Sequence, residues 1–396
     1  MYKKGFVYIY SIVISTSFFI GCSNTQNVVY LDNNIFKKDN NSTIIETTPD
    51  IIDNSSIKSN KRIIIRKEED TIISSIIKDN IVDENISKII RENNDTIAIL
   101  LSSSKIGKYA LETTTAINTF LLYKNSDFNI EIYDIDKIDI EDINKSFNSF
   151  NINKIMGLIP MQSINILNKI SQNENSNIYL PLVNKNDADI DKLNNKETII
   201  FGGIDYKKQF EKLKDYANSN NLVELYGASA IGNYLHNTLG EKSVRLNRKI
   251  DDQSARYKNI LREFRRKNYS IILNTSIVKS SILLSQIYAR NVHTKHILST
   301  QLNYTPLLFS LTQRNDRRKF IVANSIGYIP KDLIVYNNIM KENISYNWAS
   351  YSTIVGLEYL INKNISIFKD LSLENNQIIY PIKLYKANRR SFELIK

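Results

Sequence analysis

The sequence predicts an α/β protein of two doubly wound parallel-sheet lobes joined by a hinge, preceded by a signal segment, a tether and a helix. Short apolar runs alternate with segments of helical periodicity from Asp95 to about Ala323, and this order builds parallel sheets covered by helices. The alternation forms two series of strand–helix units, which are too many for a single sheet. The length of 396 residues also suits two lobes.

The first 21 residues have the pattern of a signal peptide. Lys3 and Lys4 form a basic region, Phe6 to Ile20 an apolar region that is short for a spanning helix, and Gly21 supplies the small residue before a cleavage point. Phe18 to Cys22 resembles a bacterial lipobox, which implies acylation of Cys22, the only cysteine. A buried thiol is the alternative. We therefore expect a lipid anchor at Cys22 and no disulfide.

Two further segments precede the folded body. Residues 22–67 are rich in Asn, Thr, Ser and Asp without apolar periodicity, which predicts a flexible tether. Residues 68–93 carry isoleucines at helical spacing among polar residues, which predicts an amphipathic helix that packs on the body or binds a partner.

Lobe 1 is predicted to comprise residues 94–203 and 335–396. Thr96 to Leu101 is an apolar run typical of a strand buried on both faces, and the periodicity of Lys108 to Tyr123 indicates a helix after a serine turn. The same pattern predicts further strands at 128–133, 154–158, 178–182 and 198–201, helices at 162–172 and 349–361, and a hairpin formed by 378–384 and 391–394. The acidic stretch from Asp134 to Asp142 is interpreted as an exposed edge segment.

Lobe 2 is predicted to comprise residues 204–334 and repeats the alternation. Expected strands lie at 222–226, 243–247, 270–273, 296–300 and 319–323, and expected helices at 206–219, 228–239, 253–267, 279–290 and 304–311.

The net charge of +11 bears on partners. Loss of Lys3 and Lys4 with the signal leaves 50 basic and 41 acidic side chains, a net charge of +9. This excess favours anionic surfaces such as lipid headgroups or cell-wall polymer. No predicted helix carries a basic face with interleaved aromatics, so we expect no nucleic-acid partner.

Catalytic and metal-binding patterns are missing from the sequence. The three histidines, His236, His293 and His296, lack a third ligand at metal-binding spacing. No nucleophile elbow, phosphate-binding loop or zinc-protease motif occurs. We therefore expect a protein that is not an enzyme and that needs no metal or cofactor.

Several segments resemble the type 1 periplasmic binding proteins in the same order. They are Ile97 to Asp134, Met156 to Ser163, Phe201 to Tyr216, and the Leu225-Tyr226-Gly227 turn with Gly232. The pattern at Ile106 to Leu111, the segment from Phe201 to Ala217 and the lipid anchor are most similar to the C-terminal domain of the penicillin-binding protein activator lipoproteins. The resemblance covers roughly Asp95 to Lys396.

The resemblance implies an interlobe cleft at the carboxyl ends of the strands, where free N–H groups of helix N-termini favour anionic ligands. The candidate ligand-binding residues are Ser102, Ser103, Ser104, Tyr109, Gln162, Ser163, Asn184, Tyr226, Ala228 and Thr275. Helix capping alone is the alternative role for the serines. Thr113 and Thr119 stand where amino-acid-binding members carry glycines, which indicates an altered pocket.

Two functions follow from this resemblance. The first is a non-catalytic regulator or scaffold whose partner is a peptidoglycan synthase. The second is a solute receptor that delivers an amino acid or similar polar ligand to an ABC importer. Ser23 stands where an Asp commonly retains lipoproteins at the inner membrane, so we expect a periplasm-facing anchor in the outer rather than the inner membrane.

Overall fold

The computed structural model describes residues 96–395 apart from 107, 127, 171–175, 251–256 and 265–267. The described residues belong to one compact unit. The predicted signal peptide (1–21), Cys22, the tether (22–67) and the helix at 68–93 lie outside the described residues and stay predictions.

The first sheet has seven strands in the order β11-β12-β5-β4-β3-β1-β2. All neighbouring strands run parallel except the antiparallel pair β11 and β12. The strands are β1 Thr96–Leu101, β2 Asn129–Asp134, β3 Lys154–Leu158, β4 Asn177–Leu180, β5 Ile199–Phe201, β11 Ser372–Glu374 and β12 Gln377–Ile379.

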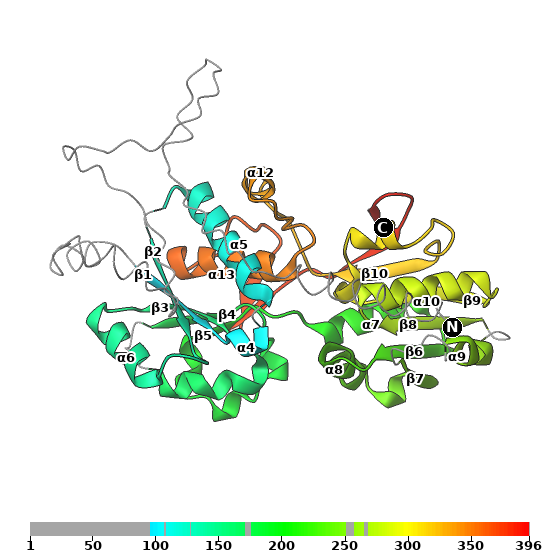
Figure 1. The fold of residues 1–396 in the computed structure, drawn as a ribbon, viewed down its shortest axis with the longest axis horizontal. Helices are drawn as coiled ribbons and strands as arrows, with labels where there is room; N and C mark the ends of the chain where they lie inside the picture. The colour runs from blue at the N-terminus through cyan, green and yellow to red at the C-terminus, as the bar shows by residue number, and fades with distance from the viewer. Residues whose placement is uncertain are drawn as a thin grey trace, which may run out of the picture. The chain divides into compact units, whose positions relative to one another are not determined.

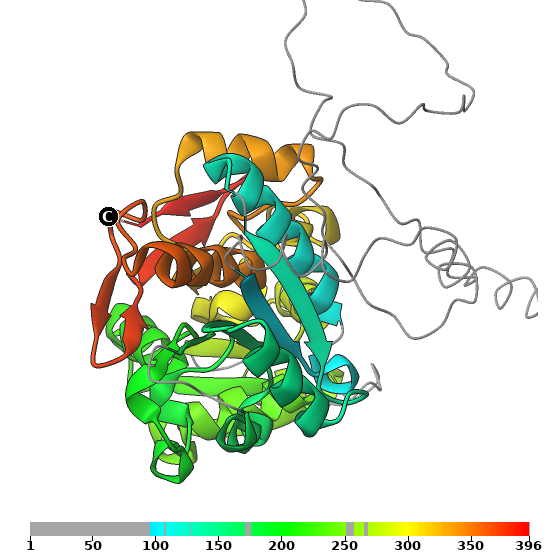
Figure 2. The same ribbon diagram turned by 90° about the vertical axis from the view of Figure 1, so that its left-hand side faces the viewer.

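Both faces of this sheet are covered, as its apolar strands require. Ile97 and Ile99 of β1 pack with α5 (Lys108–Lys124), α13 (Trp348–Asn362) and α12 (Lys331–Ile339). Ala98 and Leu100 pack on the other face with α6 (Ile140–Ser149) and the 3₁₀ helix η2 (Met161–Lys169). Figure 1 shows α5 and α13 side by side, and Figure 2 shows α12 beside α5.

The second sheet also has seven strands, in the order β14-β13-β10-β9-β8-β6-β7. Its first five strands in the chain pair in parallel, and the last two add antiparallel pairs. The strands are β6 Leu222–Gly227, β7 Leu246–Ile250, β8 Tyr269–Asn274, β9 Thr294–Ser299, β10 Phe320–Asn324, β13 Lys383–Ala387 and β14 Phe392–Leu394.

Helices cover this sheet on both faces as well. One core cluster joins it to α9 (Tyr257–Phe264), α10 (Ile277–Ala289) and α11 (Leu307–Leu311). The other joins it to α7 (Tyr206–Ala217) and α8 (Ala230–Leu239). The short elements that remain are α4 Ser103–Ile106, η3 Lys185–Asp187, η4 Ile190–Lys192, η5 Lys196–Thr198, η6 Glu241–Ser243 and η8 Gln301–Asn303.

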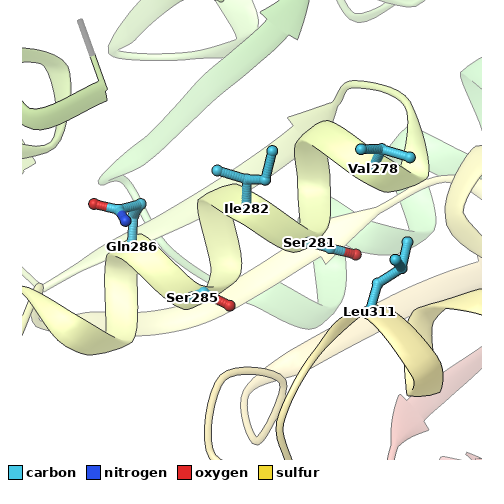
Figure 3. A pocket seen from close by; sticks show the side chains of 6 residues that line it. All are labelled: Val278, Ser281, Ile282, Ser285, Gln286 and Leu311. Atoms are coloured by element: carbon cyan, nitrogen blue, oxygen red, sulfur yellow. The ribbon is translucent and has the colours of Figure 1, made fainter. Parts of the chain in front are cut away.

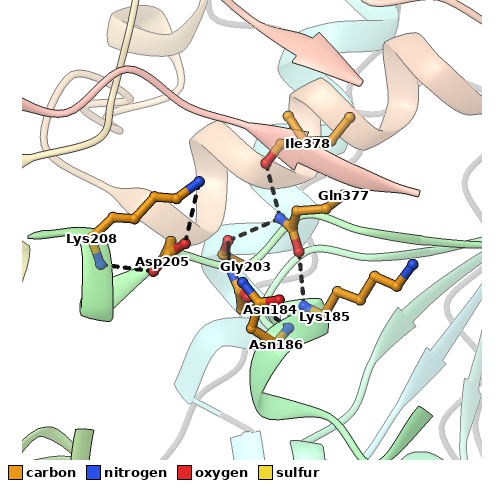
Figure 4. A network of polar contacts seen from close by, with 8 residues as sticks. All are labelled: Asn184, Lys185, Asn186, Gly203, Asp205, Lys208, Gln377 and Ile378. Carbon is orange, nitrogen blue, oxygen red and sulfur yellow. Dashed lines mark hydrogen bonds and ion pairs between the residues drawn. The ribbon is translucent and has the colours of Figure 1, made fainter. Parts of the chain in front are cut away.

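The chain crosses between the lobes three times, at 202–205, 325–330 and 380–382. The first crossing is fixed by the amides of Asn184 and Gln377, which both donate to the carbonyl of Gly203, at 3.2 and 3.4 Å. Figure 4 shows this network, in which Gln377 also accepts a hydrogen bond from the N–H of Lys185 at 2.8 Å. A β-carbon at Gly203 would lie 2.3 Å from the carbonyl carbon of Val183, so this close approach requires glycine.

The predicted fold class, two α/β lobes built on mostly parallel sheets, is confirmed. Several elements differ from the predictions. The helix α12 and the strand β11 were not predicted, and the strand expected at 243–247 is β7 at Leu246–Ile250. The helix expected at 162–172 is the 3₁₀ helix η2, and the supposed edge segment at 134–142 turns into α6. The hairpin expected from 378–384 and 391–394 forms instead from β13 (Lys383–Ala387) and β14, whereas 378–379 belong to β12 of the first sheet. β13 and β14 extend the second sheet, so 383–394 does not belong to lobe 1 as the boundary 335–396 implied.

Candidate interlobe site

The serine loop at the end of β1 is the centre of the predicted cleft. Parallel pairing of β1 with β2 sets Leu101 opposite Asp134, so the chain leaving β2 passes beside this loop. The buried Ser102 hydroxyl donates to the Asp136 carboxylate at 3.0 Å, and the Ser104 N–H donates to the same carboxylate at 2.8 Å. The Ser103 N–H donates to Asp134 at 3.3 Å. The loop therefore already binds two carboxylates, and both belong to this chain.

The pKa values of the two aspartates agree with this arrangement. Burial raises the pKa of Asp136, but hydrogen bonds from Ser104 and Ser102 outweigh burial and hold the pKa below its ordinary value. Burial also raises the pKa of Asp134. Hydrogen bonds from Ser103, the Asp136 N–H and Lys137 lower it by more, so the pKa lies below its ordinary value. Both groups are therefore anionic at neutral pH, and a ligand carboxylate at this loop would have to displace one of them.

The other predicted residues of the first lobe divide into two kinds. Gln162 is exposed and Ser163 half-buried, both in η2. Asn184 is buried and fully engaged: its oxygen accepts from the Asn186 N–H at 2.9 Å, and its amide donates to Gly203. Asn184 thus fixes the first crossing.

The predicted residues of the second lobe also divide. Thr275 is buried and exchanges a hydrogen bond with the Ser280 hydroxyl at 2.7 Å. Ala228 is exposed, and the half-buried Tyr226 stacks on His236 with ring centroids 3.9 Å apart. Behind this stack the buried carboxylate of Glu224 binds His236 Nδ1 and the Asn274 amide, each at 2.7 Å. The internal network orients the Tyr226 ring.

A contact between tyrosine side chains and an aspartate joins the two lobes. The Tyr234 hydroxyl on α8 donates to the Asp187 carboxylate on η3, and Tyr234 packs edge-to-face on Tyr206 with centroids 5.9 Å apart. Burial raises the pKa of Tyr206, and the neighbouring Tyr109 and Asp187 raise it further. Burial also raises the pKa of Asp187, as does the charge of Asp205, against the hydrogen bond from Tyr234. Tyr109 of the predicted set therefore lies near enough to Tyr206 to affect its pKa.

A second interlobe contact lies in the segment between α12 and α13. Tyr346 packs on Tyr304 with centroids 5.1 Å apart and approaches Phe392 of β14 at 6.3 Å. Tyr304 and Phe392 themselves lie 4.6 Å apart in the second lobe. These two contacts, together with the ion pair between Asp370 and Lys383 of β13 at 3.2 Å, join the lobes through side chains in addition to the three crossings.

Sequence reasoning placed the serine loop at a strand end but missed the residues that occupy it and the residues that join the lobes. These are Asp134, Asp136, Asp187, Tyr206 and Tyr234. The Tyr-Asp ending of β2 was the available signal, because the carboxyl ends of adjacent parallel strands meet at one edge. Whether the ten predicted residues bind a ligand stays a prediction.

Two features are absent from the part of the chain that the structure describes. No group of three His, Cys, Asp or Glu side chains in it is placed to hold a metal ion. No helix in it is both long and apolar enough to cross a bilayer.

Two helix-flanked sheets linked by three crossings define the fold of the type 1 periplasmic binding proteins, and this chain has that fold. No protein-family model matches the sequence, and neither does any curated protein. Solved structures do match. The C-domain of LpoA from Haemophilus influenzae, a regulator of PBP1A, matches with a TM-score of 0.52 at 10% identity, covering 76% of this chain and all of that domain.

Two further solved structures match this chain at similar scores. Full-length LpoA from the same organism matches with a TM-score of 0.52 at 10% identity, over 81% of this chain and 64% of that protein. The branched-chain amino acid binding protein LivJ from Streptococcus pneumoniae, in complex with isoleucine, matches with a TM-score of 0.53 at 11% identity, over 77% of this chain and all of that one. At these identities the likeness establishes the fold, which regulators and substrate-binding proteins share.

Proposed function

We propose that this protein is a membrane-anchored lipoprotein of the bacterial cell envelope that acts as a non-catalytic regulator or scaffold, with a peptidoglycan synthase as its partner. The observation that carries the proposal is the serine loop of the first lobe. Its hydroxyl and N–H donors bind Asp134 and Asp136 of the same chain. A solute receptor needs such donors for its ligand, whereas a scaffold does not.

The contacts between the lobes support the same proposal. Receptors of this fold work by hinge closure around a ligand. Here the Tyr234–Asp187 hydrogen bond and the packing of Tyr346 on Tyr304 connect the lobes directly. A body held in one arrangement suits a constant docking surface. The likeness to LpoA, a regulator of PBP1A, agrees with this role.

The predicted anchor gives the proposal its location. An acylated Cys22 followed by a tether would hold the two lobes at the periplasmic side of a membrane, and the residue after Cys22 favours the outer one. A receptor that serves an importer in the inner membrane would not need an anchor in the outer membrane.

The second candidate function is a solute receptor. It is supported by predicted cleft residues that remain accessible to a ligand. Gln162 and Ala228 are exposed, and Ser163 and Tyr226 are half-buried. The likeness to LivJ with bound isoleucine agrees with a polar ligand between the lobes. In this reading the ligand would contact these residues and leave the serine loop to Asp134 and Asp136.

One pair of measurements separates the two functions. The folded fragment 94–396 is screened by thermal shift against amino acids, short peptides and muropeptides, and is tested for stimulation of glycan polymerisation by the peptidoglycan synthases of the source organism. Stimulation without a thermal shift from small solutes supports the regulator. A clear shift from one amino acid, with no effect on any synthase, would exclude the regulator and establish the receptor.

A further inference from the structure

An apolar groove runs along the outside of the second lobe between α10 and α11. It has a volume of about 300 Å³ and is lined by Val278, Ser281, Ile282, Ser285, Gln286 and Leu311. Figure 3 shows Ser281 and Ser285 on the side of α10 that faces Leu311, with Val278 and Ile282 one turn apart on the same helix. Val278 is 52% exposed and Ile282 41% exposed, and Leu307 of α11 is also exposed. Two helices thus present apolar side chains to the outside at one place.

Exposed arginines border this apolar surface. Arg314 and Arg318 lie in the turn that follows α11, and Arg389 and Arg390 lie in the turn between β13 and β14. The first turn is held against α10, because the Ser285 hydroxyl donates to the Asp316 carboxylate at 2.8 Å. The arginines of this turn are therefore fixed next to the groove.

A buried arginine holds the two turns together. Arg317 donates from Nε to the carbonyl of Asn388 at 3.1 Å, and from Nη2 to the carbonyl of Arg389 at 2.6 Å. Its Nη1 donates to the Thr312 hydroxyl at 3.0 Å, and its guanidinium lies over the Phe309 ring. Arg317 thereby keeps four exposed guanidinium groups in one region without being exposed itself.

Acidic side chains are turned away from this region or paired. Asp316 is the only acidic residue among 276–319, a stretch with seven lysines and arginines, and it is buried. On the neighbouring α9, Glu263 pairs with Arg248 at 2.8 Å. On β14, Phe392 packs on Phe309 of α11, so the alternation of the strand directs Glu393 to the opposite face. The surface beside α11 is therefore apolar and cationic.

We propose that this surface, formed by α10, α11 and the two arginine turns, docks on an anionic phospholipid bilayer. Apolar side chains flanked by basic ones are the composition of surfaces that lie in the membrane interface. Guanidinium groups bind lipid phosphates in a two-pronged manner. A protein-binding rim ordinarily mixes both charge signs, and this one holds no exposed acidic side chain between 276 and 319. This inference stands apart from the proposed function.

The test is a vesicle co-sedimentation assay with the fragment 94–396. This fragment contains both sheets and all four core clusters, and it lacks the apolar signal segment, Cys22 and the predicted amphipathic helix. We expect binding to vesicles of phosphatidylcholine with phosphatidylglycerol, weaker binding to phosphatidylcholine alone, and loss of binding at high ionic strength. The double variants Val278→Asp/Ile282→Asp and Arg314→Glu/Arg318→Glu should each weaken binding by about tenfold or more.

The matched control is Val335→Asp/Ile339→Asp on α12 of the first lobe, where both side chains are apolar and each is 56% exposed. This control variant should bind the vesicles as strongly as the parent fragment does. Melting curves check that every variant folds. No binding to anionic vesicles, or equal binding by the parent and both groove variants, would overturn the proposal. Loss of binding with inorganic phosphate at constant ionic strength would also overturn it, because the arginines would then bind free phosphate and not a bilayer.

Discussion

Asp136 illustrates how one side chain decides what a loop can do. Its carboxylate accepts hydrogen bonds from the Ser102 hydroxyl and the Ser104 N–H, the donors at the start of α4. Because those bonds favour the charged form, they outweigh burial and lower the pKa of Asp136. A carboxyl group with a lowered pKa stabilises the fold above its unfolded pKa, and this stabilisation is lost as the pH falls through the folded value.

Replacement of Asp136 should therefore have a pH-dependent effect. We expect Asp136→Asn to lower the melting temperature at pH 7, where the native carboxylate is charged, and to have a smaller effect near pH 3, below the unfolded pKa of about 3.9. Melting curves from pH 7 to pH 3 measure the difference. Asp139→Asn is the control, because Asp139 is the N-cap of α6 but makes no side-chain capping bond. An equal loss at both pH values would show that the charge of Asp136 is irrelevant.

The same loop shows what sequence could predict about individual residues. The run of serines after an apolar strand predicted polar groups at the carboxyl edge of a sheet, and Ser102, Ser103 and Ser104 do lie there. That Asp134 and Asp136 bind them depends on the register between β1 and β2, which brings residues 31 to 34 positions apart together. Asn184 likewise binds Gly203, 19 positions away, whereas the partner of Thr275 is Ser280, five positions along the chain.

Pairs of helices in the first lobe are joined by charge as well as by apolar packing. Lys124 at the end of α5 forms an ion pair at 2.8 Å with Glu358 of α13, whose side chain is only 2% exposed. Removal of one partner of a buried pair leaves an uncompensated charge, at a cost of about 3–5 kcal/mol. Lys124 is itself partly exposed, so water reduces this cost.

We expect Lys124→Met to lower the free energy of unfolding by about 2–3 kcal/mol, because Glu358 then stays buried without its cation. The double variant Lys124→Met/Glu358→Leu should recover much of that loss, since two apolar side chains fill the same space. Denaturant unfolding measures both. The control is Lys145→Met, which breaks an exposed pair with Asp142 on α6 and should leave stability unchanged. A double variant no more stable than Lys124→Met would contradict the role of the unpaired charge.

At the scale of elements, periodicity predicted the buried strands well and the surface segments less well. β1 and β3 have the predicted bounds, because fully buried parallel strands are continuous apolar runs. The helix α6 was missed because its ten residues hold only two buried side chains, Ile143 and Phe147, among acidic and polar ones. A hairpin was predicted from 378–384 and 391–394, but its first strand is interrupted where the chain crosses between the lobes at 380–382, and no local pattern says which of two similar sheets a hairpin joins.

The whole molecule depends on how the three crossings are held. Asp370 links the second crossing to the start of β13: its carboxylate accepts from the Tyr328 N–H at 2.8 Å and from Lys383 Nζ at 3.2 Å. In the first crossing, the Ser352 hydroxyl donates to the carbonyl of Gly202 at 2.9 Å, and Tyr179 binds Ser352 at 3.1 Å. Burial raises the pKa of Tyr179 to about 12, so it stays a neutral hydrogen-bonding group. The crossings are thus anchored in the core of the first lobe.

Side-chain contacts outside the crossings then decide whether the lobes move. Since Tyr234 binds Asp187 and Tyr346 packs on Tyr304, we expect one narrow distribution of distances between the lobes. The fragment 94–396 has no cysteine, so spin labels at Glu197→Cys and Lys242→Cys report that distance. Tyr234→Phe with Tyr346→Ala should broaden the distribution, because two side-chain contacts between the lobes are then lost. Tyr288→Ala, at an exposed tyrosine of α10, is the control. A parent distribution already as broad as that of the double variant would mean that these contacts do not hold the lobes, and hinge closure around a solute would become the better account of the fold.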